Sequence, residues 1–234
     1  MNKAITDQPA GQQTSSVKLL SAMVGLGMLC ALLIAVTYEG TRPRIAFLRA
    51  EALEQAIFQV IPGAEKTTAF SYEEEVGFRP KADEETAALY AGYNEAGELV
   101  GLALEAAGQG YAGVIKILYG YDPQQEVVIG FQVLETKETP GLGDKIEKDP
   151  NFLANFEALD VQMAARGDSL ANEVITVKNG EKQSPWQIDG ITGATISSRA
   201  IGDMLGESTS KWVPIIQQHL NQLSKDVLPQ AEGS

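Results

Sequence analysis

The chain has 234 residues, which is enough for one sizeable domain with an appendage. Its 18 Lys and Arg residues against 31 Asp and Glu give a formal net charge of −13, and such an acidic chain repels the phosphates of nucleic acids. The single cysteine, Cys30, excludes an intramolecular disulfide and a cysteine-based metal cluster, and the single histidine, His219, leaves little material for Ser/His catalysis.

Residues 19–36 form an uncharged apolar run of eighteen residues, which nearly crosses a hydrocarbon core of about 30 Å as a helix. We therefore predict a tail at 1–16, a transmembrane anchor at 17–38 and a folded domain at 39–234. A cleaved signal peptide is the alternative, but the run is longer than a usual h-region and no clear A-x-A site follows it. The basic residues on the two sides do not favour an N-inside orientation: they are Lys3 and Lys18 before the run, and Arg42, Arg44 and Arg49 after it.

The domain begins with an amphipathic helix, because apolar residues recur at helical spacing from Ile45 to Val60, until Pro62 and Gly63 end the pattern. Residues 70–85 are acidic and lack periodicity, which indicates an exposed strand edge or loop. Four strand-like runs follow, at residues 88–93, 99–103, 113–119 and 127–134. The sequence Tyr-Asp-Pro at 121–123 predicts a hairpin between the last two runs.

Near the end of the chain, one apolar helical stripe covers residues 200–205 and a second covers residues 212–223, after Gly206. No internal repeat is present. The pattern predicts a single α+β domain in which an antiparallel sheet is flanked by helices.

The first candidate site segment follows the last strand and reads E-T-K-E-T-P-G-L-G-D at residues 135–144. Gly141 and Gly143 allow a close approach of the backbone, Thr139 offers a hydroxyl, and Leu142 offers an apolar contact for a flat ring. An ordinary turn at the end of a strand is the other interpretation.

The second segment reads D-G-I-T-G-A-T-I-S-S-R at residues 189–199, just before the first C-terminal stripe. Small and hydroxylated residues at a helix start offer N–H groups and the positive end of the helix dipole, which favour a phosphate. The segment lacks the P-loop spacing, and its nearest cation is Arg199. A simple helix cap is the alternative.

Both segments resemble the FMN-binding domain family. D-G-I-T-G-A-T at 189–195 is similar to its D-x-x-[ST]-G-A-[ST] flavinylation motif, in which the last threonine carries FMN through a phosphoester. The resemblance implies covalent FMN on Thr195, and it assigns the surrounding cofactor contacts to Asp189, Thr192, Gly193, Ala194, Ser197 and Ser198. Residues 138–143 are similar to the family loop that lies against the flavin ring, which adds Glu138, Thr139, Pro140, Gly141, Leu142 and Gly143.

The N-terminal anchor, the G-Q-G-Y-A-G run at 108–113 and the order of the two motifs resemble the G subunits of Rnf-type ion-translocating electron transport complexes. That resemblance implies an electron-carrying protein without catalytic residues or a metal of its own. The implied partners are the other membrane, iron–sulfur and flavin subunits, and a flavin transferase that uses FAD as the FMN donor. The implied location is a bacterial inner membrane, with a single span, a cytoplasmic tail and the domain on the periplasmic side.

Three alternatives remain open at this point. A component like the C subunit of the sodium-translocating NADH:quinone reductase shares the flavinylation motif. A non-redox binding or scaffold domain on a membrane stalk would use the acidic surface for docking. A hydrolase with a threonine nucleophile is the weakest alternative, because no histidine lies near Thr195 in the sequence to act as a base.

Overall fold

A computed structural model describes residues 16–81 and 87–224. The chain divides into two compact units, residues 1–50 and 51–234. The long helix α1 (Ser16–Val60) begins in the first unit and ends in the second. Except for Ser16, the predicted tail lies outside the described residues.

The first unit contains a helix that is long and apolar enough to cross a membrane, with a mean hydropathy of 2.5 over its most apolar window. Side chains all round this part of α1 are exposed, including Leu20, Met23 and Ile34. A helix with exposed apolar side chains on every side is typical of a membrane span.

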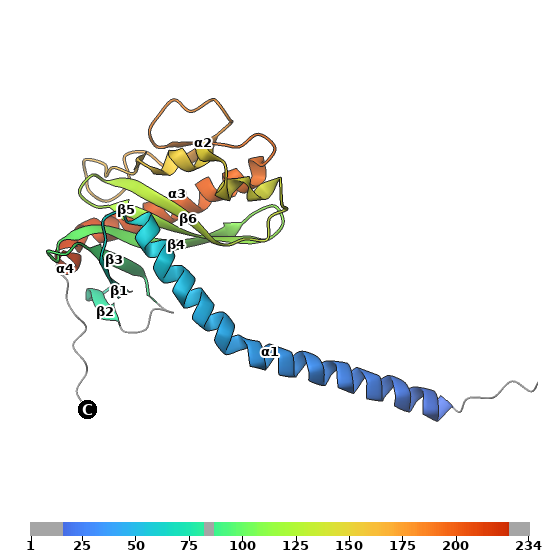
Figure 1. Ribbon diagram of the computed structural model, residues 1–234. Helices are drawn as coiled ribbons and strands as arrows, with labels where there is room; N and C mark the ends of the chain where they lie inside the picture. The colour runs from blue at the N-terminus through green and yellow to red at the C-terminus, as the bar shows by residue number, and fades with distance from the viewer. Residues whose placement is uncertain (1–15, 82–86, 225–234) are drawn as a thin grey trace, which may run out of the picture. The chain divides into compact units, whose positions relative to one another are not determined.

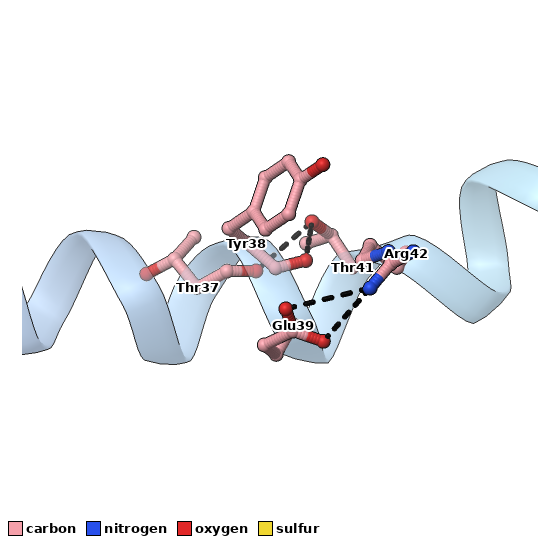
Figure 2. A network of polar contacts seen from close by, with 5 residues as sticks. All are labelled: Thr37, Tyr38, Glu39, Thr41 and Arg42. Carbon is pink, nitrogen blue, oxygen red and sulfur yellow. Dashed lines mark hydrogen bonds and ion pairs between the residues drawn. The ribbon is translucent and has the colours of Figure 1, made fainter.

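Polar side chains at the end of the apolar window are satisfied within α1 itself (Figure 2). Thr41 Oγ1 donates to the carbonyl of Thr37 at 2.9 Å, and Arg42 forms an ion pair with Glu39 at 3.4 Å. The Arg42 guanidinium also lies 5.7 Å from the centre of the Tyr38 ring. Arginine beside an aromatic ring at the edge of an apolar helix is typical of a membrane interface.

The second unit is built on a seven-stranded antiparallel sheet in the order β2-β1-β3-β4-β5-β6-β7 (Figure 1). Its strands are β1 (Lys66–Glu73), β2 (Gly77–Lys81), β3 (Leu89–Tyr93), β4 (Leu99–Gln109), β5 (Val114–Asp122), β6 (Val127–Glu135) and β7 (Leu159–Asp160). The predicted antiparallel sheet and its four central strands are confirmed. Asp122 closes the predicted β5–β6 hairpin by accepting from the N–H groups of Gln124 and Gln125.

The acidic segment at 70–85 is largely an edge hairpin rather than a loop. β1 and β2 pair through Tyr72 and Phe78, and the side chains of Phe70 and Phe78 are buried. Apolar residues spaced among the acidic ones therefore anchor this edge to the core. Residues 82–86 of the segment lie outside the described residues.

The remaining elements surround the sheet and carry the loops discussed below. They are η2 (Gly143–Glu147), α2 (Pro150–Leu153), η3 (Ala154–Phe156), the parallel pair β8 (Ile175–Val177) and β9 (Gln187–Asp189), α3 (Thr195–Gln218) and α4 (Leu220–Leu223).

Alternation along β5 divides the core between the two faces of the sheet. Ile115, Ile117 and Tyr119 pack in the larger cluster, with the apolar stripe of α3. Leu118 packs in the smaller cluster on the opposite face, with Ile57 and other apolar residues near the end of α1. Helices therefore cover both faces of the sheet.

The first C-terminal stripe and most of the second belong to one continuous helix, α3, which runs through Gly206, whereas Leu220 and Leu223 of the second stripe lie in α4. A Cβ at Gly206 would lie 2.8 Å from the Val174 carbonyl oxygen, so glycine here permits the strand-side backbone to approach the helix. Close packing, and not a helix stop, explains this glycine.

The end of α1 also requires a close backbone approach, and this generates a prediction. A Cβ at Gly120, near the end of β5, would overlap the carbonyl of Val60. We expect Gly120→Ala to lower the free energy of unfolding by about 3 kcal/mol through overpacking, because the added methyl meets a backbone carbonyl. Urea unfolding of the full chain in detergent, followed by the fluorescence of Trp186 and Trp212, measures this loss.

Gly167→Ala is the matched control, because a Cβ at Gly167 would have no atom within 4 Å and only its φ of +72° opposes the change. We expect a cost of about 1 kcal/mol there. Equal costs at the two glycines would contradict the packing explanation.

Candidate functional site

The two candidate segments, about fifty residues apart in the sequence, meet at the first turn of α3. The link is the buried carboxylate of Glu138, which is only 6% exposed. It accepts a hydrogen bond from Ser197 Oγ at 2.5 Å and another from the backbone N–H of Ala112 at 2.8 Å. One carboxylate therefore joins the loop after β6, the β4–β5 turn and the start of α3.

The loop after Glu138 is held in a tight turn. The N–H groups of Leu142 and Gly143 both donate to the carbonyl of Thr139 at 3.1 Å, and Gly141 has a φ of +79°. Asp144 Oδ1 accepts from the Gly141 N–H at 2.6 Å. The hydrogen bond from Lys148 lowers the pKa of Asp144, and the Gly141 N–H adds to this effect. The carboxylate that fixes the turn is therefore held in its ionised form.

The T-G-A-T loop is held from the other side by Asp189 and Asn155. Asn155 Oδ1 accepts from the Asp189 N–H at 2.9 Å, and its amide donates to the Asp189 carbonyl at 3.2 Å. Asp189 Oδ1 accepts from the Gly180 N–H at 2.7 Å. Gly193 then turns the chain with a φ of +86°, and α3 begins at Thr195.

An open cavity of about 330 Å³ lies between these loops. Its walls are mostly apolar and are formed by Tyr111, Glu138, Thr139, Leu142, Gly143, Gly193, Ala194, Thr195, Ile196 and Ser197. Tyr111 is 70% exposed, Leu142 55% and Ile196 52%. Large apolar side chains that surround a cavity and remain exposed to solvent favour the binding of a flat apolar ligand.

Eight of the thirteen predicted site residues line this cavity. They are Glu138, Thr139, Leu142, Gly143, Gly193, Ala194, Thr195 and Ser197. Thr192 and Ser198 line a second cavity, which also has Thr195 in its wall. Pro140, Gly141 and Asp189 line neither cavity, and Gly141 and Asp189 instead hold the loops through the hydrogen bonds described above.

The structure also places two further residues in the site. Tyr111 reaches the cavity from the β4–β5 turn, and Ile196 follows Thr195 on α3. The sequence could have indicated Tyr111 as a site residue, because it is an aromatic residue among the glycines of G-Q-G-Y-A-G. No group of three or more His, Cys, Asp or Glu residues that could hold a metal occurs in the described part of the chain. His219 lies in neither cavity and bonds to the Ile215 carbonyl instead.

Thr195 is an exposed threonine in the wall of the cavity. Its side chain is exposed at the first residue of α3, and the preceding residue, Ala194, provides no side-chain cap. The first N–H groups of a helix that lacks such a cap favour an anion. The site therefore combines a hydroxyl, an anion-attracting helix start and an apolar cavity.

Several known proteins resemble this chain in sequence. The model of the FMN-binding domain family matches residues 110–209. The G subunit of the ion-translocating oxidoreductase complex of Methanosarcina acetivorans is 33% identical over 189 residues, covering 80% of this chain and 89% of that protein. The corresponding G subunit of Shewanella oneidensis is 32% identical over 197 residues, covering 78% and 81%.

A solved structure shares the fold. It is the C subunit of the Na⁺-translocating NADH-quinone reductase of Parabacteroides distasonis, with a TM-score of 0.58 and 20% sequence identity. The match covers 74% of this chain and 96% of that chain.

The role of Glu138 in joining three segments generates a prediction. In Glu138→Ala, the buried Ser197 hydroxyl and the Ala112 N–H lose their acceptor, so we expect the free energy of unfolding to fall by about 2–4 kcal/mol. Glu138→Gln keeps an acceptor oxygen for Ala112 and an amide for Ser197, and we expect a fall of about 1 kcal/mol. Urea unfolding in detergent measures both values; an alanine variant as stable as the glutamine variant would contradict this role.

Proposed function

The chain belongs to the family of G subunits of ion-translocating oxidoreductase complexes and contains an FMN-binding domain, and we propose that it carries FMN covalently on Thr195 and relays electrons within its complex. The observation that carries the proposal is the position of Thr195. Its exposed hydroxyl opens on an apolar cavity at the start of a helix, within the region that the family model matches.

The cavity residues fit the flavin. A volume of about 330 Å³ is within the range of small-molecule sites, about 300–1,000 Å³, and Tyr111 and Leu142 offer flat or apolar surface to a ring system. The cavity is open, which leaves part of a bound ring accessible to a partner. When bound, FMN supplies the redox chemistry, and the protein supplies position and electrostatic environment.

Formation of the ester requires outside help. A threonine hydroxyl is a weak nucleophile without a base, and Glu138, the carboxylate in the cavity wall, is already bonded to Ser197. We propose that a transferase provides the base and FAD. The Thr195 oxygen attacks the flavin-side phosphorus, a phosphoester bond forms, the pyrophosphate bond breaks, AMP leaves and the hydroxyl proton passes to the transferase.

The proposed role in the assembly follows from the anchor and the missing catalytic groups. α1 would hold the domain at a bacterial inner membrane, on the periplasmic side, next to the membrane, iron–sulfur and flavin subunits of a complex of ferredoxin/NAD type. Electron transfer by proximity needs no general acid or base from this chain. A tethered cofactor also suits a compartment in which free FMN is scarce.

The alternatives have less support. A scaffold domain has no need of an apolar cavity beside an exposed hydroxyl. A hydrolase needs a base, and the only histidine of the chain, His219, packs against the Tyr72 ring, outside the cavity that contains Thr195. The curated relatives reported above are both G subunits, and the likeness to the C subunit of the quinone reductase supports the fold alone.

Intact-mass measurement tests the proposal. Full-length chain co-expressed with a flavin transferase should gain the mass of FMN less water, and Thr195→Ala should abolish that gain. Thr195→Ser keeps a hydroxyl at the same place and should keep the addition.

Thr139→Ala is the matched control, because it removes the other threonine hydroxyl in the cavity wall and should leave the addition in place. The proposal fails if the unaltered chain shows no addition, or if the addition survives in Thr195→Ala.

A further inference from the structure

The second cavity, of about 510 Å³, differs in character from the first although both have Thr195 in their walls. Its lining is mainly polar: Thr176, Val177, Lys178, Asn179, Glu181, Gly190, Ile191, Thr192, Thr195, Ser198 and Arg199. One residue, Thr195, therefore lines both an apolar cavity and a polar cavity. A ligand with a flat apolar part and a charged part would match the pair.

Arg199 belongs to the same helical face as Thr195. The two residues are four positions apart on α3, which makes them neighbours on the helix surface. Both residues also line the second cavity.

Lys178 enters the same cavity from a separate segment, just after β8. That segment is fixed to the T-G-A-T loop by three hydrogen bonds around Gly190 and Asp189. The Gly190 N–H donates to the Val177 carbonyl at 3.1 Å, the Asn179 amide donates to the Gly190 carbonyl at 2.9 Å, and the Gly180 N–H donates to Asp189 at 2.7 Å. Lys178 and Arg199 therefore lie in the wall of one cavity, on segments that these hydrogen bonds join.

Neither cation has an ion-pair partner in the described part of the chain. Within the described ranges 16–81 and 87–224, no carboxylate lies within 4.0 Å of the charged nitrogens of Lys178 or Arg199. Glu181 is the one carboxylate that lines the cavity. Two unpaired cations in one cavity of a chain with a net charge of −13 favour an anionic ligand.

The serine hydroxyls beside Thr195 are already engaged. Ser197 donates to Glu138, and the buried Ser198 Oγ accepts from the Ile191 N–H at 3.3 Å and lies 3.3 Å from the Thr195 carbonyl. Besides the first N–H groups of α3, an anion at Thr195 therefore needs hydrogen bonds from side chains other than these two serines.

We propose that the second cavity is the phosphate seat of the cofactor, with Arg199 and Lys178 as the residues that hold the phosphate. The inference rests on the proposed function and extends it: the ring occupies the first cavity, the phosphate occupies the second, and Thr195 stands where they meet. Arg199 suits this role because a guanidinium binds phosphate oxygens through two parallel hydrogen bonds, and Lys178 adds a point charge.

Measurements of reversible binding distinguish the contribution of the phosphate to affinity from that of the ring. Full-length Thr195→Ala, purified in detergent, cannot be esterified, so FMN and riboflavin can be titrated into it and followed by flavin fluorescence. The two probes share the ring and differ in the phosphate. We expect FMN to bind at least about tenfold more tightly than riboflavin, and the difference to shrink with added salt.

The cation variants locate the phosphate. Adding Lys178→Gln and Arg199→Gln to Thr195→Ala should weaken FMN about tenfold or more and leave riboflavin unchanged. The retained affinity for riboflavin shows that the variant is folded. Lys116→Gln with Lys211→Gln is the control for net charge, since neither residue lines the cavity, and it should leave the FMN preference intact.

Glu181→Gln should change the affinity for FMN in the opposite direction. Removing the one carboxylate of the cavity should tighten FMN severalfold without affecting riboflavin, a gain that loss of folding cannot imitate.

Three results would overturn the phosphate seat. They are equal affinity of Thr195→Ala for FMN and riboflavin, equal loss of FMN affinity in the cation and control variants, and no saturable binding of FMN up to about 1 mM. The proposed function is tested separately by the mass of the unaltered chain. If the unaltered chain carries an FMN adduct and any of these three results is found, the proposed covalent carrier stands and only the phosphate seat is wrong.

Discussion

The candidate site depends on one buried carboxylate. Glu138 is removed from water, and a buried carboxylate is costly unless hydrogen bonds replace its hydration. The donors come from Ser197 on α3 and from Ala112 in the β4–β5 turn, so meeting this requirement brings three distant segments together. Gly143 packs against the same carboxylate so closely that a Cβ there would overlap it. The position of α3 against its neighbouring loops is thus fixed at the turn that carries Thr195.

The sheet was predictable from the sequence because its signals are local. Ile115, Ile117 and Tyr119 alternate with residues of the opposite face, and burial on two faces requires that pattern. β8 and β9 have three residues each, too few to show alternation, and depend on contacts made after folding. The two sequence motifs contain most of the residues that line the first cavity. They do not include Lys178 of the second cavity, because the position of Lys178 depends on the pairing of β8 with β9.

The charge of the whole chain and the charge around Thr195 point in opposite directions. A net charge of −13 disfavours a phosphate at long range, but beyond about 10 Å exposed charges are largely screened at 0.1 M salt. Within that distance, the nearby cations determine whether an anion is favoured at Thr195. Arg199 follows Thr195 by one helical turn, and the ammonium of Lys145 lies 4.0 Å from the place of a Cβ at Gly193. An acidic protein can therefore accept an anion at this helix start.

The openness of the first cavity explains why a covalent bond would be useful here. Tyr111 and Leu142 are more than half exposed, so a ring between them keeps much of its surface in water and gains only part of the free energy of full burial. Reversible binding of such a ring would be weaker than that of a fully buried one, whereas closing the cavity would strengthen binding and block access to an electron-transfer partner. The proposed bond to Thr195 would resolve this conflict, because the local concentration of the ring would then be set by the tether. The same exposure that limits affinity leaves an edge available for electron transfer.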